Sequence, residues 1–169
     1  MGTPRFRLGL RVRRVESACA GRDGRRAAGR PGPRGARKVS RARFDDCKLL
    51  GARFEGVSLE HVVFTGCKLD YALFDKARAT GPVLFVRCSL REAEFNGCSL
   101  PGSLLDDCDL SLTVFGPGSY RGCDLRGNDL SSVLGAHHLK RVILDRAQVL
   151  QLASALAAEL DVSFGDDLG

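Results

Sequence analysis

A period of five residues runs through most of this 169-residue chain and constrains its fold more than any other feature. Written in fives from Ala42, the sequence reads ARFDD CKLLG ARFEG VSLEH VVFTG CKLDY ALFDK ARATG. One extra residue enters near Gly81-Pro82, and the blocks then run from VLFVR to NDLSS. A period of five fits neither the 3.6 of an α-helix nor the 2 of a β-strand. The backbone is therefore predicted to turn once in every block, and the repeats to stack as a solenoid.

The third residue is large and apolar in 17 of the 18 blocks, with Ala79 as the exception. The first residue is small, as in Ala42, Cys47 and Ala52. Both positions are predicted to point inward, because the other three hold mostly glycine and charged residues. The predicted structural core consists of Phe44, Leu49, Phe54, Leu59, Phe64, Leu69, Phe74, Phe85, Leu90, Phe95, Leu100, Leu105, Leu110, Phe115, Tyr120, Leu125 and Leu130.

This pattern resembles the pentapeptide-repeat family, whose motif A(D/N)LxX tolerates Cys, Ser or Val at the small position. The resemblance runs from about Ala42 to Val133. It implies an all-β fold, a right-handed quadrilateral β-helix in which four blocks make one square coil. The 18 blocks would then form a rod roughly 20 Å long at a coil spacing of ~4.8 Å. The coils would stack Phe54, Phe74, Phe95 and Phe115 on one face and Leu49, Leu69, Leu90, Leu110 and Leu130 on another.

Charge divides the chain into two parts. Residues 1–43 hold 14 Lys and Arg against two acids, whereas residues 44–169 hold 12 against 18 acids. A basic segment rich in Gly and Pro cannot bury enough apolar surface to fold, so residues 1–41 are predicted to be a disordered tail. Three interpretations of the tail stay open: non-specific polyanion binding, an unstructured leader, or a misassigned start. The β-helix is predicted over residues 42–134.

The C-terminal part, residues 135–169, is predicted to cap the open end of the last coil. Residues 147–160, AQVLQLASALAAEL, have apolar residues at helical spacing. Asp145 stands where a helix N-cap would be. We expect a helix over about 147–160 and a short strand over about 161–164. In some members of the family that the chain resembles, such a cap makes a dimer contact, so capping alone and capping with homodimerisation both stay open.

Six of the seven cysteines occupy the small inward position. A zinc site needs its ligands around one point, whereas stacked coils would spread these side chains along a line. We interpret them as small apolar residues of the core. The predicted ladder is Cys47, Cys67, Cys88 and Cys108, and the other two are Cys98 and Cys123. Cys19 is predicted to be an exposed thiol of the tail.

No residue pattern selects a catalytic site. His61, His137 and His138 lack a nucleophile and an orienting acid at a motif spacing. Asp106, Asp107 and Asp109 fall at outward positions and are interpreted as solvated charges. The sequence therefore predicts no enzyme, no cofactor and no metal ion. It also contains no apolar run long enough to span a membrane, and the predicted location is the cytoplasm.

The predicted function is a non-catalytic scaffold for protein–protein interaction, with an unknown partner. The alternative is mimicry of duplex DNA, which resembles the branch of the family that protects DNA gyrase from quinolones. Such a mimic needs dense negative charge, because B-DNA carries one charge per ~1.7 Å. Residues 44–80 hold six acids and five bases, and residues 81–134 hold seven acids and four bases. This thin acidity favours the scaffold.

Overall fold

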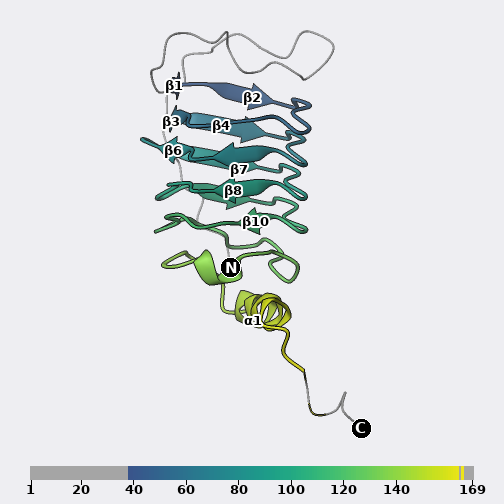
Figure 1. Cartoon of the computed structure of the whole chain (residues 1–169). Coiled ribbons are helices and arrows are strands. Elements are labelled where there is room, and N and C mark those ends of the chain that lie inside the picture. Colours follow the sequence, from purple (N-terminus) through teal and green to yellow (C-terminus); the bar gives the residue numbers. More distant parts are fainter. Residues whose placement is uncertain (1–37, 164, 166–169) are drawn as a thin grey trace, which may run out of the picture.

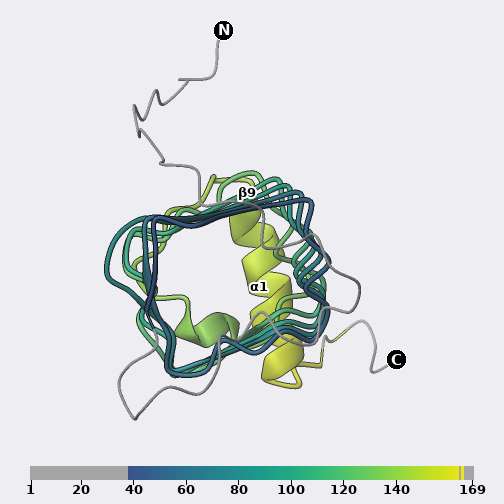
Figure 2. The same cartoon turned by 90° about the horizontal axis from the view of Figure 1, so that it is seen from above.

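Most blocks end in a residue whose backbone is left-handed, and this residue forms a corner of the solenoid. The φ angle is 50° at Asp46, 62° at Gly51 and 59° at Gly56, the last residues of three successive blocks. Glycine adopts this conformation freely, whereas Tyr71 (φ 59°) and Leu112 (φ 56°) adopt it against a steric cost. One corner per block bends the chain around a square, the outline seen along the axis in Figure 2.

The structure is a computed structural model that describes residues 38–163 and residue 165. Short parallel strands stack in successive coils, and a helix lies across the C-terminal end (Figure 1). The strands are β1 (Lys38–Ser40), β2 (Arg43–Asp45), β3 (Ser58–Glu60), β4 (Val62–Thr65), β5 (Leu73–Asp75), β6 (Arg78–Ala79), β7 (Val83–Val86), β8 (Glu94–Asn96), β9 (Leu104–Asp106) and β10 (Val114–Phe115). A 3-10 helix, η1 (Ala136–His138), and an α-helix, α1 (Gln148–Glu159), follow. The fold is the predicted quadrilateral β-solenoid with a C-terminal helix.

The four faces of the solenoid are numbered in the order in which blocks 42–61 visit them. The first face is the sheet β2-β4-β7-β9, and the third is β5-β8-β10. The fourth face is β1-β3-β6. The second face is held by isolated parallel bridges, such as Lys48↔Lys68 and Ser89↔Asp109.

The register between coils locates the one extra residue. Phe44 pairs with Phe64, 20 residues on, whereas Phe64 pairs with Phe85, 21 residues on. On the fourth face, Ser58 pairs with Arg78 at a separation of 20, and Arg78 pairs with Ser99 at 21. The insertion therefore lies between β6 and β7, where Gly81 and Pro82 are found. The loop absorbs it without disturbing the stacking on either side.

Phenylalanine rings form stacks inside the solenoid. The predicted ladder of the third face is confirmed: ring centroids lie 4.6 Å apart for Phe54–Phe74, 4.7 Å for Phe74–Phe95 and 5.6 Å for Phe95–Phe115. A second ladder, on the first face, joins Phe64 to Phe44 at 4.8 Å and to Phe85 at 5.0 Å. Edge-to-face contacts link the two ladders, which adds to the stabilisation from burial.

The third residues of the blocks fill the interior. Leu59, Phe64 and Phe85 have no exposed surface, and Tyr120 is 2% exposed. Leu49, Phe54, Leu69, Phe74, Leu90, Phe95, Leu100, Leu105, Leu110, Phe115, Leu125 and Leu130 are also buried. Phe44, in the first described coil, is partly buried and packs against the core.

The solenoid begins earlier than the sequence analysis predicted. Residues 38–41 were assigned to the tail, but Lys38–Ser40 form β1 and pair with β3. Val39 stands five residues before Phe44 and packs against the core, so it is the third residue of one more block. That block was missed because Arg37 occupies the position where the repeat normally has a small residue.

The coil also continues beyond residue 134. Leu134 bridges to Val114, and Ile143 bridges to Asp124 at a separation of 19 rather than 20. Ala136 and Leu139 are buried within this last, irregular turn. The deletion of one residue and the short helix η1 hide the repeat from a period-five reading of the sequence.

Two details of the predicted cap are wrong. The N-cap residue of α1 is Ala147, which makes no capping hydrogen bond through its side chain, and not Asp145. Asp145 instead donates its backbone N–H to the Oε1 atom of Gln148 at 2.7 Å. Residues 161–163 form no strand, and the backbone N–H of Val162 instead donates to the carbonyl oxygen of Ala157 in α1 at 3.0 Å.

Predictions for residues 1–37, Cys19 among them, and for Phe164 and residues 166–169 lie outside the described part of the chain. Within the described residues, neither α1 nor η1 is long and hydrophobic enough to span a lipid bilayer.

Candidate interaction surfaces

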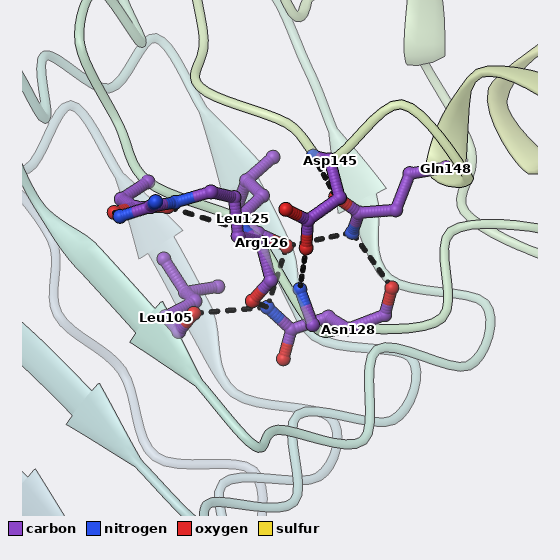
Figure 3. A network of polar contacts seen from close by, with 8 residues as sticks. Leu105, Leu125, Arg126, Asn128, Asp145 and Gln148 are labelled. Carbon is purple, nitrogen blue, oxygen red and sulfur yellow. Dashed lines mark hydrogen bonds and ion pairs between the residues drawn. The ribbon is translucent and has the colours of Figure 1, made fainter. Parts of the chain in front are cut away.

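Helix α1 is fixed to the end of the solenoid by the side chain of Gln148. Its amide nitrogen donates to the carbonyl oxygens of Leu125 and Asn128, each at 2.8 Å. Gln148 is 4% exposed, so these bonds are shielded from water. Figure 3 shows the side chain reaching from α1 toward the backbone of the preceding coil. One glutamine thus occupies carbonyl groups that a further coil would otherwise use.

Asn128 continues this network into the solenoid (Figure 3). It occupies the small inward position of its block and is 4% exposed. Its Oδ1 atom accepts from the backbone N–H of Cys108 at 2.8 Å, and its Nδ2 atom donates to the oxygens of Leu105 at 2.9 Å and Leu125 at 2.8 Å. Sequence reasoning missed this role, although an amide at a position normally held by Ala or Cys was a visible signal.

Two further side chains of α1 bind the last turn. The Oε1 atom of Gln151 accepts from the backbone N–H of Leu130 at 3.1 Å. Glu159 accepts from the backbone N–H of Ala136 at 2.5 Å and pairs with Nδ1 of His137 at 2.8 Å. Burial alone would raise the pKa of Glu159, but these hydrogen bonds outweigh it and hold the pKa below its usual value. The inward side of α1 therefore combines a polar clamp, formed by Gln148, Gln151 and Glu159, with the apolar side chains of Leu152, Ala155 and Leu156, which pack against the core.

The opposite side of α1 is apolar and exposed. Leu150 is 77% exposed, Leu160 is 74% exposed and Val149 is 58% exposed. Most of the exposed large apolar side chains in the described part of the chain gather at this C-terminal end: Leu134, Ile143, Val149, Leu150, Leu160 and Val162. Exposed apolar side chains gathered at one end of a molecule are typical of interaction sites.

Charged side chains divide unevenly among the faces of the solenoid. The outward positions of the fourth face hold Lys38, Arg78 and Arg121, with Glu60 as their acid, alongside serines. Lys38 and Glu60 form an ion pair at 2.8 Å. Carboxylates instead predominate on the first face and its corner. The fourth face therefore carries mainly positive charge, and the first face with its corner carries mainly negative charge.

The comparisons with known proteins agree with this architecture. Residues 38–115 match the family model described as "Pentapeptide repeat region". Residues 38–115 are a region of the pentapeptide-repeat family. No curated protein matches its sequence.

Several solved structures, among them two described as pentapeptide repeat proteins (Rfr23 and HetL), are similar to this one at low identity. Full-length QnrB1, a plasmid-mediated fluoroquinolone resistance protein, is 16% identical, with 70% of this chain and 89% of that chain covered and a TM-score of 0.27. Rfr23 from the cyanobacterium Cyanothece 51142 is 19% identical, with 64% and 60% covered and a TM-score of 0.22. HetL from the cyanobacterium Nostoc sp. strain PCC 7120, which is involved in heterocyst differentiation regulation, is 14% identical, with 63% and 49% covered and a TM-score of 0.26.

The cysteines of this pentapeptide-repeat protein lie inside the solenoid. Cys47, Cys67, Cys88, Cys98, Cys108 and Cys123 are all buried, between 1% and 8% exposed. Burial raises the pKa of Cys98 to about 11 and that of Cys123 to about 12. These two thiols are therefore protonated at neutral pH, the form that is neither nucleophilic nor metal-binding. No group of three or more potential metal ligands is found among the described residues.

The three histidines and the three aspartates singled out in the sequence, Asp106, Asp107 and Asp109, do not come together at one place. His61 forms a corner with φ 54°, and His137 belongs to the clamp on Glu159. The ring of His138 lies against that of His137, with centroids 3.9 Å apart and ring planes tilted by 46°. Asp109 accepts from Ser111 and lies 3.8 Å from Arg91 on the second face. Asp106 and Asp107 are exposed on the first face and its corner.

Proposed function

We propose that this pentapeptide-repeat protein is a non-catalytic scaffold that binds other proteins through its outer surface. The observation that carries the proposal is the gathering of exposed apolar side chains at the C-terminal end, on a helix whose polar side is already engaged. Burying such side chains against a partner is favourable by about 25 cal/mol per Å². The cytoplasm is the proposed location.

Cysteine and histidine, which act as catalytic residues in enzymes, make structural contacts in this protein. The thiols of Cys98 and Cys123 are buried and protonated. His137 is paired with Glu159, which holds η1 against α1. These contacts support a role without catalysis, because a catalytic group must reach its substrate in a reactive protonation state.

A second copy of the chain is the proposed occupant of the exposed side of α1. Val149, Leu150 and Leu160 lie on that side with Ala153 and Ser154, and none of these side chains carries a charge. Two such helices can pack closely, since small residues let the backbones approach while leucines fill the contact. The resulting dimer would be a longer rod with its outward faces free.

Light scattering after gel filtration of the full chain tests this contact. The expected result is a dimer at micromolar concentration and a monomer for Leu150→Glu, because a buried carboxylate would oppose association. Leu50→Glu is the matched control, since Leu50 is also apolar and 53% exposed but lies on the second face. A dimer that persists in Leu150→Glu, or a monomeric parent protein, would contradict dimerisation through the exposed side of α1.

Mimicry of duplex DNA, with DNA gyrase as the target, is the second candidate. The excess of acids over bases in residues 44–134 favours it, and the basic outward residues of the fourth face oppose it. A gyrase supercoiling assay with and without a quinolone separates the two candidates. The scaffold proposal expects no inhibition and no protection at stoichiometric protein, whereas either effect would favour mimicry.

A further inference from the structure

The middle of the first face carries an apolar column on its outer side. Val63, Leu84 and Leu104 are paired residue by residue across β4, β7 and β9, and each is half-buried. Val86 stands beside this column, two residues beyond Leu84 on the same strand, and its side chain points outward too. These four residues are called the aliphatic column below.

The other faces use the same outward position differently. On the second face it is held by Lys48, Lys68, Ser89, Asp109 and Asp129, and on the fourth by Lys38, Ser58, Arg78, Ser99 and Ser119. On the third face it is held by Arg53, Leu73, Glu94, Val114 and Leu134. An uninterrupted run of three aliphatic residues is thus specific to the first face, and the repeat itself does not require it.

Charged residues frame the aliphatic column. The coil before it carries an ion pair between Arg43 and Asp45 at 2.7 Å, and the coil after it carries one between Asp124 and Arg126, also at 2.7 Å. Along the side toward the second face lie Asp106 and Asp107, both exposed and without an ion pair within residues 38–163, and the exposed Arg87 at the corner of the coil before them. The column therefore lies between two ion pairs, and two carboxylates and one guanidinium stand on its flank toward the second face.

A partner can bind these coils only by packing against their side chains, because their backbone hydrogen bonds are already made within the sheet. Strands β4 and β7 are hydrogen-bonded on both sides, as the order β2-β4-β7-β9 shows, so no strand can be added there. The coil spacing on this face is 4.8 to 5.0 Å, measured between the stacked rings beneath the column. An α-helix rises about 5.4 Å per turn, so a helix lying along the rod would place one side chain opposite each coil.

We propose that the aliphatic column docks an amphipathic α-helix of a partner protein, one that carries an aliphatic stripe and Lys or Arg along one flank. The aliphatic stripe packs on Val63, Leu84 and Leu104, and the basic flank lies against Asp106 and Asp107. A helix of about 14 residues, roughly 20 Å long, also reaches both framing ion pairs. The inference rests on the proposed scaffold function and names the kind of partner.

A designed peptide tests the chemistry of the surface. The probe is a fluorescent, amidated helix of about 14 residues built from Ala, Leu and Lys, with leucines at helical spacing and lysines on one flank. Its affinity for the full chain is expected to fall at least tenfold with Leu84→Lys. The matched control, Leu73→Lys, occupies the same outward position on the third face and should leave the affinity within twofold.

Two further variations check the direction of charge. A peptide with glutamates in place of the lysines is expected to bind at least tenfold more weakly, and the double variant Asp106→Asn, Asp107→Asn should bind the lysine peptide several-fold more weakly than the parent protein does. Circular dichroism confirms that each variant is folded. Equal effects of Leu84→Lys and Leu73→Lys, or equal binding of the two peptides, would overturn the proposal.

Photo-crosslinking separates failure of this site from failure of the scaffold function. In cells, p-benzoylphenylalanine replaces Leu84, Leu73 or Leu150 in the full chain, one position at a time, and the crosslinked partner segment is sequenced. The proposal expects adducts from position 84 to a segment with helical apolar spacing and a basic flank. Adducts only from the other positions, or to a segment without that pattern, reject the docking site and keep the scaffold. An absence of protein adducts from every position rejects both.

Discussion

Gly135 and Gly127 both have a left-handed backbone, with φ of 74° and 78°, but their surroundings differ. A methyl group added at Gly135 would overlap the carbonyl oxygen of Phe115 in the preceding coil. At Gly127 the same methyl group would meet no atom within 4 Å. The two positions therefore separate the cost of the left-handed conformation from the cost of a steric clash.

We predict that Gly127→Ala lowers the free energy of unfolding by about 1–2 kcal/mol, the cost of the left-handed conformation alone. Gly135→Ala adds the overlap with the neighbouring coil and should cost at least ~3 kcal/mol. Urea unfolding followed by circular dichroism measures both. Equal losses for the two variants would show that the coils do not approach each other at Gly135.

At this scale, the sequence predicts the interior well and the corners poorly. The third-position residues could be assigned from the repeat because bulk alone distinguishes them. Tyr71 and Leu112 could not be recognised as left-handed residues, because their side chains disfavour the conformation and only the stacked neighbours impose it. Asn128 likewise occupies the small inward position but is larger than the Ala or Cys usually found there. Its role could not be predicted, because its hydrogen bonds depend on carbonyls of two different coils.

The cap is the element in which polar contacts matter most. Replacing Gln148 with Met keeps its shape but leaves the carbonyls of Leu125 and Asn128 and the N–H of Asp145 without this partner. We predict a loss of about 3 kcal/mol in the free energy of unfolding, because unpaired buried polar groups are costly. Ser154→Ala, at an exposed position of the same helix, should change it by less than about 0.5 kcal/mol. A small effect of Gln148→Met in urea unfolding would show that α1 does not close the solenoid through this residue.

Acid should weaken the clamp through Glu159. Its pKa is lowered in the folded protein, so its contribution to stability is present above the unfolded value near 4.5 and is lost as the pH falls through the folded value. Thermal melting of the parent protein and Glu159→Gln should differ at pH 7, and the difference should shrink as the pH falls below 4.5. A difference that persists unchanged at pH 3 would mean that the carboxylate charge does not hold α1.

The elements at the two ends were the hardest to predict, because there the repeat loses its regularity. Val39 continues the core by one block, and the period fails only at its small position. Between residues 134 and 145 a shortened repeat and η1 break the spacing while the parallel pairing goes on. The helix itself could be predicted from its apolar spacing, but its first residue could not, because the carboxylate of Asp145 accepts from the backbone N–H of Gly127 in the solenoid rather than from the helix N-terminus.

At the scale of the whole molecule, repetition separates folding from binding. Two residues of each block build the interior, and the other three differ from block to block, with the last of them usually left-handed at the corner. The solenoid can therefore carry a basic fourth face, an aliphatic column on the first face and an apolar cap on one rod. The sequence could predict the rod, whereas the grouping of outward residues into faces required the register of the coils.

The central claim is that positions one and three of each block point inward and the others point outward. Aspartate substituted in turn at Val83, Leu84, Phe85, Val86 and Arg87 tests it within one coil, with thermal unfolding as the measurement. We predict that Val83→Asp and Phe85→Asp abolish cooperative folding, since each buries a charge. The other three variants should melt within a few degrees of the parent protein. Comparable destabilisation by Leu84→Asp and Phe85→Asp would contradict the account.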